Sequence, residues 1–466
     1  MNILPQKDFD HVDHIDRAFI QRLQTQIRAS KQALPPYAAF FENRIMEDRR
    51  AFNGRLVAAG IKPRFITPVQ EQHIKKRTEA FFQVLPRLEA FLRSSKKAQS
   101  YFHLRKDEIK ILQADHGYPT PVPFARFDGG LTPNGFRIYE VNMNCAATPG
   151  WVEMIYDVLR QLPFWSEFQK AYNIRYHTPW IKRVYAGIME NYRAWGGRQS
   201  HPHILLLRWP AQYNQDSDRL SFGFQEYGHH AIVGDATQVE YKNGKVWYQG
   251  TQFELVVRWF DLDHLLYDVT DMYRDILRAY YDNAACIINP FSSSILAHKS
   301  LLAFFNDEQF ADHFTEQERQ TLNGMCAWTR IVEKRETTLL DGTYGSLLSH
   351  IVEMKDRFVI KQSIGTYGRN IYIGRQMNPK DWKKVIATAV KEGGWIAQEY
   401  MTLPRGQEPF VSARGSVSSR PINQDIGPYM INGTYGGCMA RASYNLVTNL
   451  MQNGCFEIVG TVRKTS

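Results

Sequence analysis

The sequence lacks long apolar runs, a signal-like N-terminus and paired cysteines. No apolar run approaches the roughly 20 residues that a membrane-spanning helix needs. The opening stretch, MNILPQKDFDHVDHID, contains no apolar core of the kind that a secretory signal peptide has. The 5 cysteines are widely spaced without a CxxC pair, which argues against a zinc site or a disulfide framework. We therefore expect a cytoplasmic protein that does not contact membranes.

Acidic residues are fewer than basic ones, and the formal net charge is +10. Such an excess of positive charge could bind nucleic acid or an anionic surface, or it could belong to a site for polyanionic substrates such as nucleotides. The basic residues are spread along the chain and form no basic block, so we expect no nucleic-acid partner. A basic protein that binds nucleic acid or membranes remains the alternative to an enzyme.

The chain is long enough for two or three domains of about 150 residues each. Its first part has apolar residues at helical spacing, including a third helical region at 35–61, and it is followed by a predicted hairpin region. An alternation of strands and helices then predicts a small α/β domain, and the last part is helical at first and then rich in strands. We predict boundaries that give the ranges 1–100, 101–175, 176–290 and 291–466.

Within the α/β range, QFELVVRWF reads as a single strand. Asp235 and Arg258 lie at or near strand ends there. Either side chain could contact a substrate, although structural hydrogen bonds are the commoner use of such residues.

The most informative segment is residues 123–151, which contains R-x-D, a short gap and then E-x-N. Alternation places Arg126 and Asp128 on one face of a strand, and Glu140 and Asn142 on one face of another. The gap, GGLTPNG, has the composition of a turn. We therefore predict a β-hairpin on which these four polar side chains converge.

The four side chains suit a metal and a phosphate group. Asp128, Glu140 and Asn142 offer the hard oxygen ligands that magnesium prefers, and Arg126 is suited to phosphate. Their neighbours are apolar, which predicts half-buried carboxylates, and a buried carboxylate needs a partner or a metal. A solvated hairpin with scattered charges is the alternative interpretation.

A second candidate lies in FVIKQSIGTYGRNIYI, which reads as strand, short glycine loop and strand. Lys361 ends the first, apolar strand. Gly365 and Gly368 flank a loop whose backbone N–H groups could approach phosphates, because glycine permits that close approach. A plain β-hairpin is the alternative interpretation.

Three further segments add to the nucleotide hypothesis. In WIAQEYM, an apolar strand ends in Gln398, Glu399 and Tyr400, an arrangement that suits an adenine pocket with a glutamate accepting from ribose hydroxyls. Lys299 opens an apolar helical segment. Arg441 lies on a predicted strand, where it could stabilise the charge of a phosphoryl group in transfer, or be a surface arginine.

In this order the motifs resemble the circularly permuted ATP-grasp ligases, and most closely the synthetase domain of glutathionylspermidine synthase. The hairpin matches that family's R-x-D and E-x-N pattern. The sequence AHKSLLAFFND resembles the region of the first nucleotide lysine, Lys299, and VIKQSIGTYGRNI resembles the region of the second, Lys361. Arg441 in CMARAS resembles a late arginine that contacts phosphate. One departure is Gln362, which stands where the family has a proline.

The resemblance implies an α/β (α+β) fold of permuted ATP-grasp architecture, with an α/β substrate domain that resembles the pre-ATP-grasp domain and with ATP and Mg²⁺ as cofactors. Asp128, Glu140 and Asn142 would hold the metal, and Arg126 and Arg441 would flank the transferred phosphoryl group. The implied activity is that of a carboxylate–amine ligase, which forms an amide through an acyl phosphate. Its partners would be a small-molecule or peptide carboxylate and an amine acceptor. A phosphotransferase on the same scaffold is the alternative, and a homodimer is compatible with the sequence.

Overall fold

The computed structural model describes residues 3–29, 60, 62–177, 179–209, 215–260, 273–365, 370–411, 417–448 and 454–463. Apart from Gly60, the third helical region predicted at 35–61 lies outside the described residues. So does Gly368 of the predicted glycine loop. The described residues form a mixed α/β structure with several sheets, as expected from the sequence.

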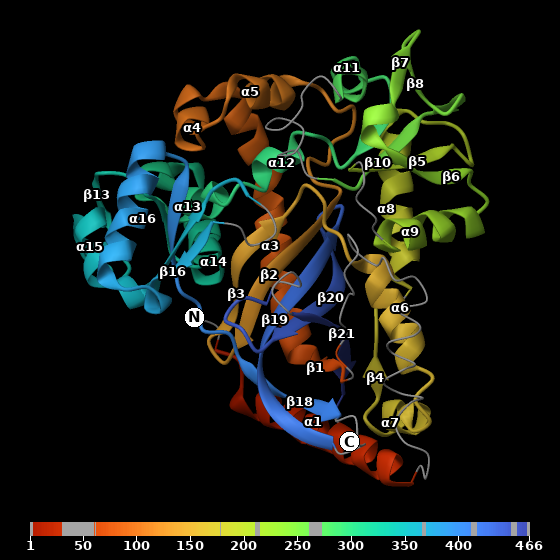
Figure 1. The fold of residues 1–466 in the computed structure, drawn as a ribbon. Coiled ribbons are helices and arrows are strands. Elements are labelled where there is room, and N and C mark those ends of the chain that lie inside the picture. The colour runs from red at the N-terminus through yellow and green to blue at the C-terminus, as the bar shows by residue number, and fades with distance from the viewer. Residues whose placement is uncertain are drawn as a thin grey trace.

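A large sheet occupies the centre of the molecule (Figure 1). Its order is β1-β21-β20-β19-β2-β3, with β18 added beside β19 and β4 beside β21. Its strands are β1 (Arg64–Ile66), β2 (Phe124–Thr132), β3 (Gly135–Asn142), β4 (Ile174–Arg175), β18 (Arg405–Val411), β19 (Val417–Ile431), β20 (Thr434–Ser443) and β21 (Cys455–Val462). All neighbours are antiparallel except β1 and β21, which run parallel.

Helix α3 (Pro68–Ser94) packs along this sheet and contributes to the main apolar core. It begins where it does because Thr67 is its N-cap. The Thr67 hydroxyl accepts from the Gln70 backbone N–H, and the Gln70 side chain accepts from the Thr67 N–H. This reciprocal pair satisfies two of the backbone donors that a helix start leaves free.

The predicted hairpin forms, with Arg126 opposite Asn142 and Asp128 opposite Glu140. The predicted turn GGLTPNG was too long, however, because β2 continues through Thr132 before the chain reverses. A β-bulge after Asp128 brings β3 so close to Gly129 that an added Cβ would lie 2.3 Å from the carbonyl oxygen of Arg137. Glycine is therefore required inside the strand there, not in a turn.

A second, antiparallel sheet has the order β12-β17-β15-β16 and its own apolar core (Figure 1, left). Its strands are β12 (Thr329–Ile331), β15 (Phe358–Gln362), β16 (Ile371–Ile373) and β17 (Trp395–Glu399). Helices α15 (Leu347–Glu353) and α16 (Pro379–Glu392) contribute to this core, and α13 (Ser300–Asn306) contacts β12 and β17. Beside it lie the hairpin β13 (Glu336–Thr338) and β14 (Tyr344–Ser346), and α14 (Glu316–Met325), which contacts β3. We call this group the small lobe.

A third, parallel sheet has the order β11-β10-β5-β6 (Figure 1, upper right). Its strands are β5 (Ile204–Arg208), β6 (Ala231–Asp235), β10 (Leu255–Arg258) and β11 (Cys286–Ile288), and its helices include α8 (Trp180–Trp195), α9 (Gln215–Glu226), α11 (Arg274–Tyr281) and α12 (Ser293–Leu296). The prediction of one strand across QFELVVRWF was wrong. That segment divides between β10 and β9 (Thr251–Phe253), and β9 belongs to an antiparallel sheet with β7 (Glu240–Lys242) and β8 (Lys245–Tyr248).

The N-terminal region is helical as predicted in α1 (Gln6–Ala29), α3 and α4 (Lys96–Tyr101), but β1 is an exception. Residues 64–66 form this strand because their partner, β21, comes from the far end of the chain. The remaining helices α5 (Lys106–Gln113), α6 (Pro149–Leu159) and α7 (Trp165–Ala171) flank the sheets. No helix within the described ranges is long and apolar enough to cross a bilayer.

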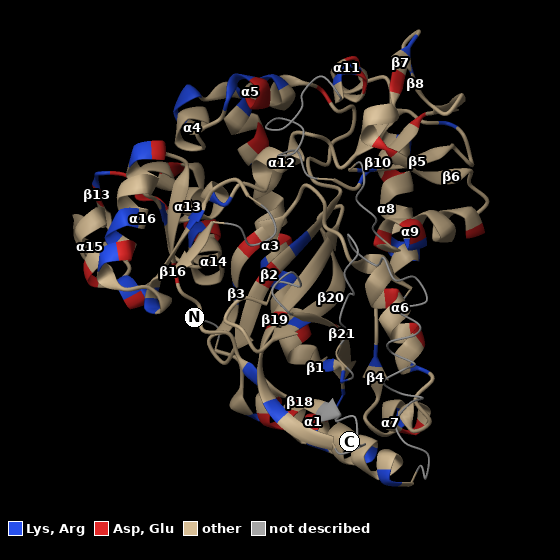
Figure 2. Ribbon diagram, viewed as in Figure 1, with Lys and Arg blue, Asp and Glu red and all other residues tan. Residues whose placement is uncertain are grey.

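Basic and acidic side chains are interspersed over the described elements, with several lysines on α16 (Figure 2). The predicted domain boundaries remain predictions, although the parallel sheet falls wholly within 176–290.

Candidate functional site

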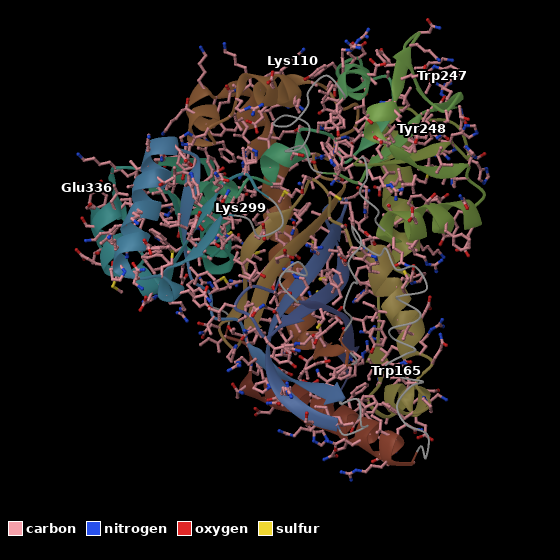
Figure 3. All side chains as sticks on the ribbon, viewed as in Figure 1. Lys110, Trp165, Trp247, Tyr248, Lys299 and Glu336 are labelled. Carbon is pink, nitrogen blue, oxygen red and sulfur yellow. The ribbon has the colours of Figure 1, made fainter. Side chains whose placement is uncertain are left out.

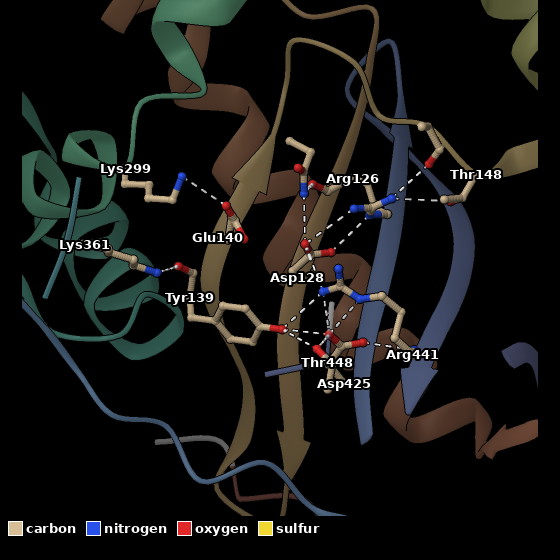
Figure 4. Close-up of polar contacts among 12 residues, drawn as sticks. Arg126, Asp128, Tyr139, Glu140, Thr148, Lys299, Lys361, Asp425, Arg441 and Thr448 are labelled. Carbon is tan, nitrogen blue, oxygen red and sulfur yellow. Dashed lines mark hydrogen bonds and ion pairs between the residues drawn. The ribbon is translucent and has the colours of Figure 1, made fainter. Parts of the chain in front are cut away.

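Six charged residues of the predicted site meet where the large sheet faces the small lobe. Figure 4 shows Arg126, Asp128, Glu140 and Arg441 on strands of the large sheet, with Lys299 and Lys361 entering from the small lobe. Lys299 is also labelled among all side chains in Figure 3. Lys299 precedes α13, and Lys361 lies on β15. The charged groups thus come from four segments that are far apart in the sequence.

Asp128 lies between two arginines. Its Oδ1 accepts from Arg126 Nε at 3.0 Å, and its Oδ2 lies 3.0 Å from an Arg441 guanidinium nitrogen. The Asn142 amide also donates to Asp128 Oδ2 at 3.0 Å. Burial alone would raise the pKa of Asp128, which is 2% exposed, but the two guanidinium groups outweigh it and lower that pKa. Asp128 is therefore an anion at neutral pH.

Arg441 is held by a residue that sequence reasoning missed, Asp425 on β19. Arg441 donates to Asp425 through its backbone N–H, its Nε and a terminal nitrogen. Tyr139 and Thr448 donate their hydroxyls to the same Asp425 oxygen, at 2.7 and 2.5 Å. Burial alone would lower the pKa of Arg441, but Asp128 and Asp425 raise it well above its usual value.

A sequence signal for Asp425 exists only in hindsight. Asp425 follows the polar residues Asn423 and Gln424 in β19, and Tyr139 of the hairpin resembles an ordinary strand residue. Neither pattern identifies a partner for Arg441, because the pairing of β19 with β20 is needed to place the two side chains together.

Glu140 faces the two lysines. Its Oε1 lies 3.2 Å from Lys299 Nζ. Burial would raise the pKa of Glu140, but Lys299 first and then Lys361 lower it below its usual value. Lys361, which is 5% exposed, donates to the backbone carbonyl of Tyr139 at 3.0 Å. Burial lowers the pKa of Lys361 to about 8, and Glu140 only partly offsets this.

Lys299 is anchored to the loop that follows β15. Its Nζ donates to the Gly365 carbonyl at 2.7 Å, and its backbone N–H donates to the Ser363 carbonyl at 2.9 Å. Ser363 also contacts Ser300, the first residue of α13. Gly365 has a φ of 152°, which favours glycine. The first part of the predicted loop therefore lies at the site, whereas Gly368 is outside the described residues.

The predicted adenine segment lies at the end of β17, and its side chains already have partners. Gln398 is buried and donates to the Thr329 hydroxyl at 3.1 Å. Glu399 forms an ion pair with Arg137 of β3 at 2.5 Å. The Tyr400 ring is covered by the Arg375 guanidinium, 3.8 Å from its centre. A ribose that binds Glu399 would therefore share this carboxylate with Arg137 or displace it.

Arg126 is also tied to the start of α6. It donates to the Ala147 carbonyl at 2.9 Å and to the Thr148 hydroxyl at 3.4 Å. Asp216 of α9 accepts from the backbone N–H groups of Thr148 and Gly150, both at 2.7 Å. Burial raises the pKa of Asp216 to about 6, and these hydrogen bonds limit the rise. The helix start that positions Arg126 is thus capped from the α/β part of the chain.

The other two residues considered from sequence have structural uses. Arg258 is 2% exposed and donates to the backbone carbonyls of Asn289, Phe260 and Pro290. Asp235 caps the turn after β6 by accepting from the backbone N–H of Thr237.

The donors around Asp128 fit magnesium. Asp128, Glu140 and Asn142 supply two carboxylates and one amide oxygen on adjacent strands. Among the described residues, no three His, Cys, Asp or Glu side chains form a metal cage. Mg²⁺ does not require one, because it commonly takes one or two carboxylates and completes its shell with substrate phosphates and water.

No protein-family model matches the sequence. A search of curated proteins also finds no match. Among solved structures, a glutathione synthetase-like effector from Globodera pallida, in its apo form, is similar with a TM-score of 0.55 and 12% identity, covering 92% of this chain and 97% of that chain. A provisionally assigned gamma-glutamylcysteine synthetase from Methylobacillus flagellatus KT has a TM-score of 0.43 and 12% identity, covering 86% of this chain and 90% of that chain. The chain therefore shares its fold with the first of these proteins.

Proposed function

We propose that the protein is an ATP-dependent carboxylate–amine ligase of the circularly permuted ATP-grasp type, resembling the synthetase domain of glutathionylspermidine synthase. The observation that carries the proposal is the meeting of Arg126, Arg441, Lys299 and Lys361 around Asp128 and Glu140. A cluster of buried cations with carboxylates inside it suits a triphosphate and its metal ion. The fold shared with a glutathione synthetase-like protein supports this reading.

The proposed reaction has two steps. An oxygen of the substrate carboxylate attacks the γ-phosphorus of ATP, the bond from that phosphorus to the β–γ bridging oxygen breaks, and ADP leaves. The amine nitrogen then attacks the acyl carbon, the carbon–oxygen bond to phosphate breaks, and the amine loses a proton to solvent. The products are an amide, ADP and phosphate. No side-chain nucleophile is needed.

The chain's own residues position the reactants and offset charge. Lys299 and Lys361 would neutralise phosphate oxygens, since both Nζ atoms lie by the Glu140 edge of the hairpin. Arg126 and Arg441 would flank the phosphoryl group in transfer. Asp425, Tyr139 and Thr448 would hold Arg441 in place before the substrate arrives. Asp128, Glu140 and Asn142 would hold Mg²⁺, which supplies further charge neutralisation on the phosphates when it is bound.

The adenosine end of the nucleotide would lie toward Gln398 and Glu399 at the end of β17 and toward Tyr400, which follows that strand. We propose that Gly365 and Gly368 bind its phosphates. In this proposal Glu399 exchanges Arg137 for ribose hydroxyls when ATP binds. The proposed substrates are a small-molecule or peptide carboxylate and an amine. We also propose that the protein is cytoplasmic.

The test measures magnesium-dependent ADP release by purified protein with a pooled mixture of amino acids, peptides and polyamines. We expect release that requires both an acid and an amine and that is lost in Glu140→Ala. Mass spectrometry of the pool should then show a new amide. A phosphorylated product without an amide would instead identify a phosphotransferase. No release, and no thermal shift with ATP and magnesium, would leave the basic binding protein as the better reading, and a salt-sensitive shift with DNA or liposomes would support it.

A further inference from the structure

Two pairs of histidines lie at the N-terminal edge of the parallel sheet, where β5 and β6 begin. His201 and His203 precede β5, and His229 and His230 precede β6. The backbone N–H of Ile204 donates to the His230 carbonyl at 2.8 Å, so the two strand starts are locked side by side. This edge is opposite the carboxyl ends of the strands and contributes no residue to the candidate site described above.

We infer that His203 and His230 form a two-histidine site for a divalent transition metal such as Cu²⁺, Ni²⁺ or Zn²⁺. Both residues are exposed, and their ring centres are 4.9 Å apart with planes inclined by 66°. A metal bound by one nitrogen of each ring, at the usual metal–nitrogen distance of about 2.0–2.1 Å, would lie roughly 3.2 Å from each ring centre. Ring centres at the observed separation then subtend roughly 100° at the metal, between square-planar and tetrahedral angles.

The tautomer of His203 suits this role. Its Nδ1 lies 3.1 Å from the Gln252 backbone carbonyl, which can only accept, so Nδ1 carries the proton. Nε2 of the neutral ring is then the nitrogen with a lone pair. A metal-binding histidine commonly donates its other ring N–H to a carbonyl in this way, because the hydrogen bond fixes the ring orientation. Gln252 lies on β9, which therefore forms the third element of the site.

A buried phenylalanine further orients both rings. Phe253 is 1% exposed, and its ring centre lies 6.0 Å from the ring centres of both His203 and His230. The two imidazoles therefore share one apolar support instead of extending freely into solvent. This lowers the conformational entropy that chelation would otherwise have to overcome.

The neighbouring pair, His201 and His229, is a natural control because the ring nitrogens of His229 are already hydrogen-bonded. His229 is 4% exposed, its Nδ1 contacts the Pro202 carbonyl at 3.0 Å, and its Nε2 contacts the Tyr185 hydroxyl at 2.9 Å. Both ring nitrogens of His229 are thus used in the fold. Metal binding through either ring nitrogen of His229 would break one of these two hydrogen bonds.

The proposed site is open. Among the described residues no third His, Cys, Asp or Glu joins a metal-binding group. Water would therefore fill the remaining positions, as in exchangeable metal sites. Imidazole nitrogen ligands favour the later first-row metals, in the order Cu²⁺ above Ni²⁺ and Zn²⁺, whereas Mg²⁺ prefers oxygen.

The test is isothermal titration of the untagged full-length protein with CuCl₂, NiCl₂ or ZnCl₂, with MgCl₂ as the control salt. We expect one high-affinity site that follows the order above. His203→Gln and His230→Gln should each weaken Cu²⁺ binding by about tenfold or more. His201→Gln, an exposed histidine on the same strand start, should retain wild-type affinity. Two-dimensional NMR should show the His203 and His230 resonances broadened first by Cu²⁺.

The double variant His203→Gln/His230→Gln gives the decisive result, since other histidines of the chain could also bind metal. Cu²⁺ binding to this variant as tight as to wild type would overturn the proposal, as would an equal loss in His201→Gln. Thermal unfolding in metal-free buffer checks that the variants are folded. Because the site is separate from the ATP proposal, magnesium-dependent turnover should be unchanged in both single variants, and the failure of one proposal leaves the other intact.

Discussion

Asp425 and Arg441 lie directly opposite each other on β19 and β20, and three hydrogen bonds join them. Arg441 reaches from this anchor to Asp128, 3.0 Å away on β2. The arginine is thus fixed between two buried carboxylates before any substrate binds. Such preorganisation is what stabilising a phosphoryl group in transfer requires, because the donors then need no rearrangement during the reaction.

Asp425→Asn should lower kcat for ADP release by roughly 10- to 150-fold, the equivalent of about 1.5–3 kcal/mol for a lost hydrogen bond to a charged group. The neutral amide cannot offset the charge of Arg441, and its NH₂ group cannot accept from the Arg441 backbone N–H as the second carboxylate oxygen does. Thr448→Val is the matched control, since it removes one hydrogen bond to the same oxygen but leaves the ion pair. Steady-state kinetics measures both variants. A wild-type kcat in Asp425→Asn would show that Asp425 does not position Arg441 for the reaction.

Lys361 should make the use of ATP less efficient at alkaline pH. Its pKa is lowered by burial to about 8, so the free protein holds a charged lysine below that pH and a neutral one above it. We expect kcat/KM for ATP to fall as the pH rises through about 8, because kcat/KM reports the free enzyme. Lys361→Arg keeps the charge at all these pH values and should remove the fall. A profile that is flat in wild type would contradict the assignment.

Glu140→Gln should raise the magnesium concentration needed for half-maximal turnover, because one carboxylate ligand is lost. It should also move the alkaline limb of the ATP profile to lower pH. Glu140 raises the pKa of Lys361, so its removal lets burial lower that pKa further. Asn142→Asp should not move this limb to lower pH, since it adds a negative charge. A magnesium dependence unchanged in Glu140→Gln would remove the metal assignment.

Lys62→Met should destabilise the fold by about 3–5 kcal/mol. Lys62 is fully buried and donates to Asp16 of α1 at 2.9 Å, so its loss leaves a buried carboxylate without its cation. Lys7→Met on the exposed face of α1 is the control and should change stability little. Urea unfolding measures both, and equal stabilities of the two variants would show that the Lys62 ion pair contributes nothing net.

Glu408 and Glu457 should make stability decline with rising pH. Burial and their mutual repulsion raise the pKa of Glu408 well above its usual value, and burial raises that of Glu457. The native pair therefore holds a proton that the unfolded chain has already released. Its contribution is complete below the usual glutamate pKa of about 4.5 and is lost as the pH rises through the raised native values. Glu408→Gln should flatten this dependence in urea unfolding measured across pH, whereas Glu353→Gln at an exposed position of α15 should not.

The hairpin was predictable because its signal is local. Alternation in two adjacent strands fixes which side chains share a face, so Arg126, Asp128, Glu140 and Asn142 could be grouped without knowledge of the fold. The extent of the turn was not predictable, because a bulge that responds to the partner strand placed the glycines inside β2. Likewise the three residues of β1 are too few to show an alternating strand pattern, and their partner β21 comes from the far end of the chain.

The residues alone indicate the available chemistry: a mixed α/β chain with a polar hairpin, two lysines in apolar surroundings and a late arginine. The tertiary structure alone decided which of these groups meet. Asp425 and Tyr139 join the site, Glu399 pairs with Arg137, and Arg258 is used in the fold. The physical reason is that burial, pKa and pairing depend on elements hundreds of residues apart in the chain, which strand alternation and spacing do not encode.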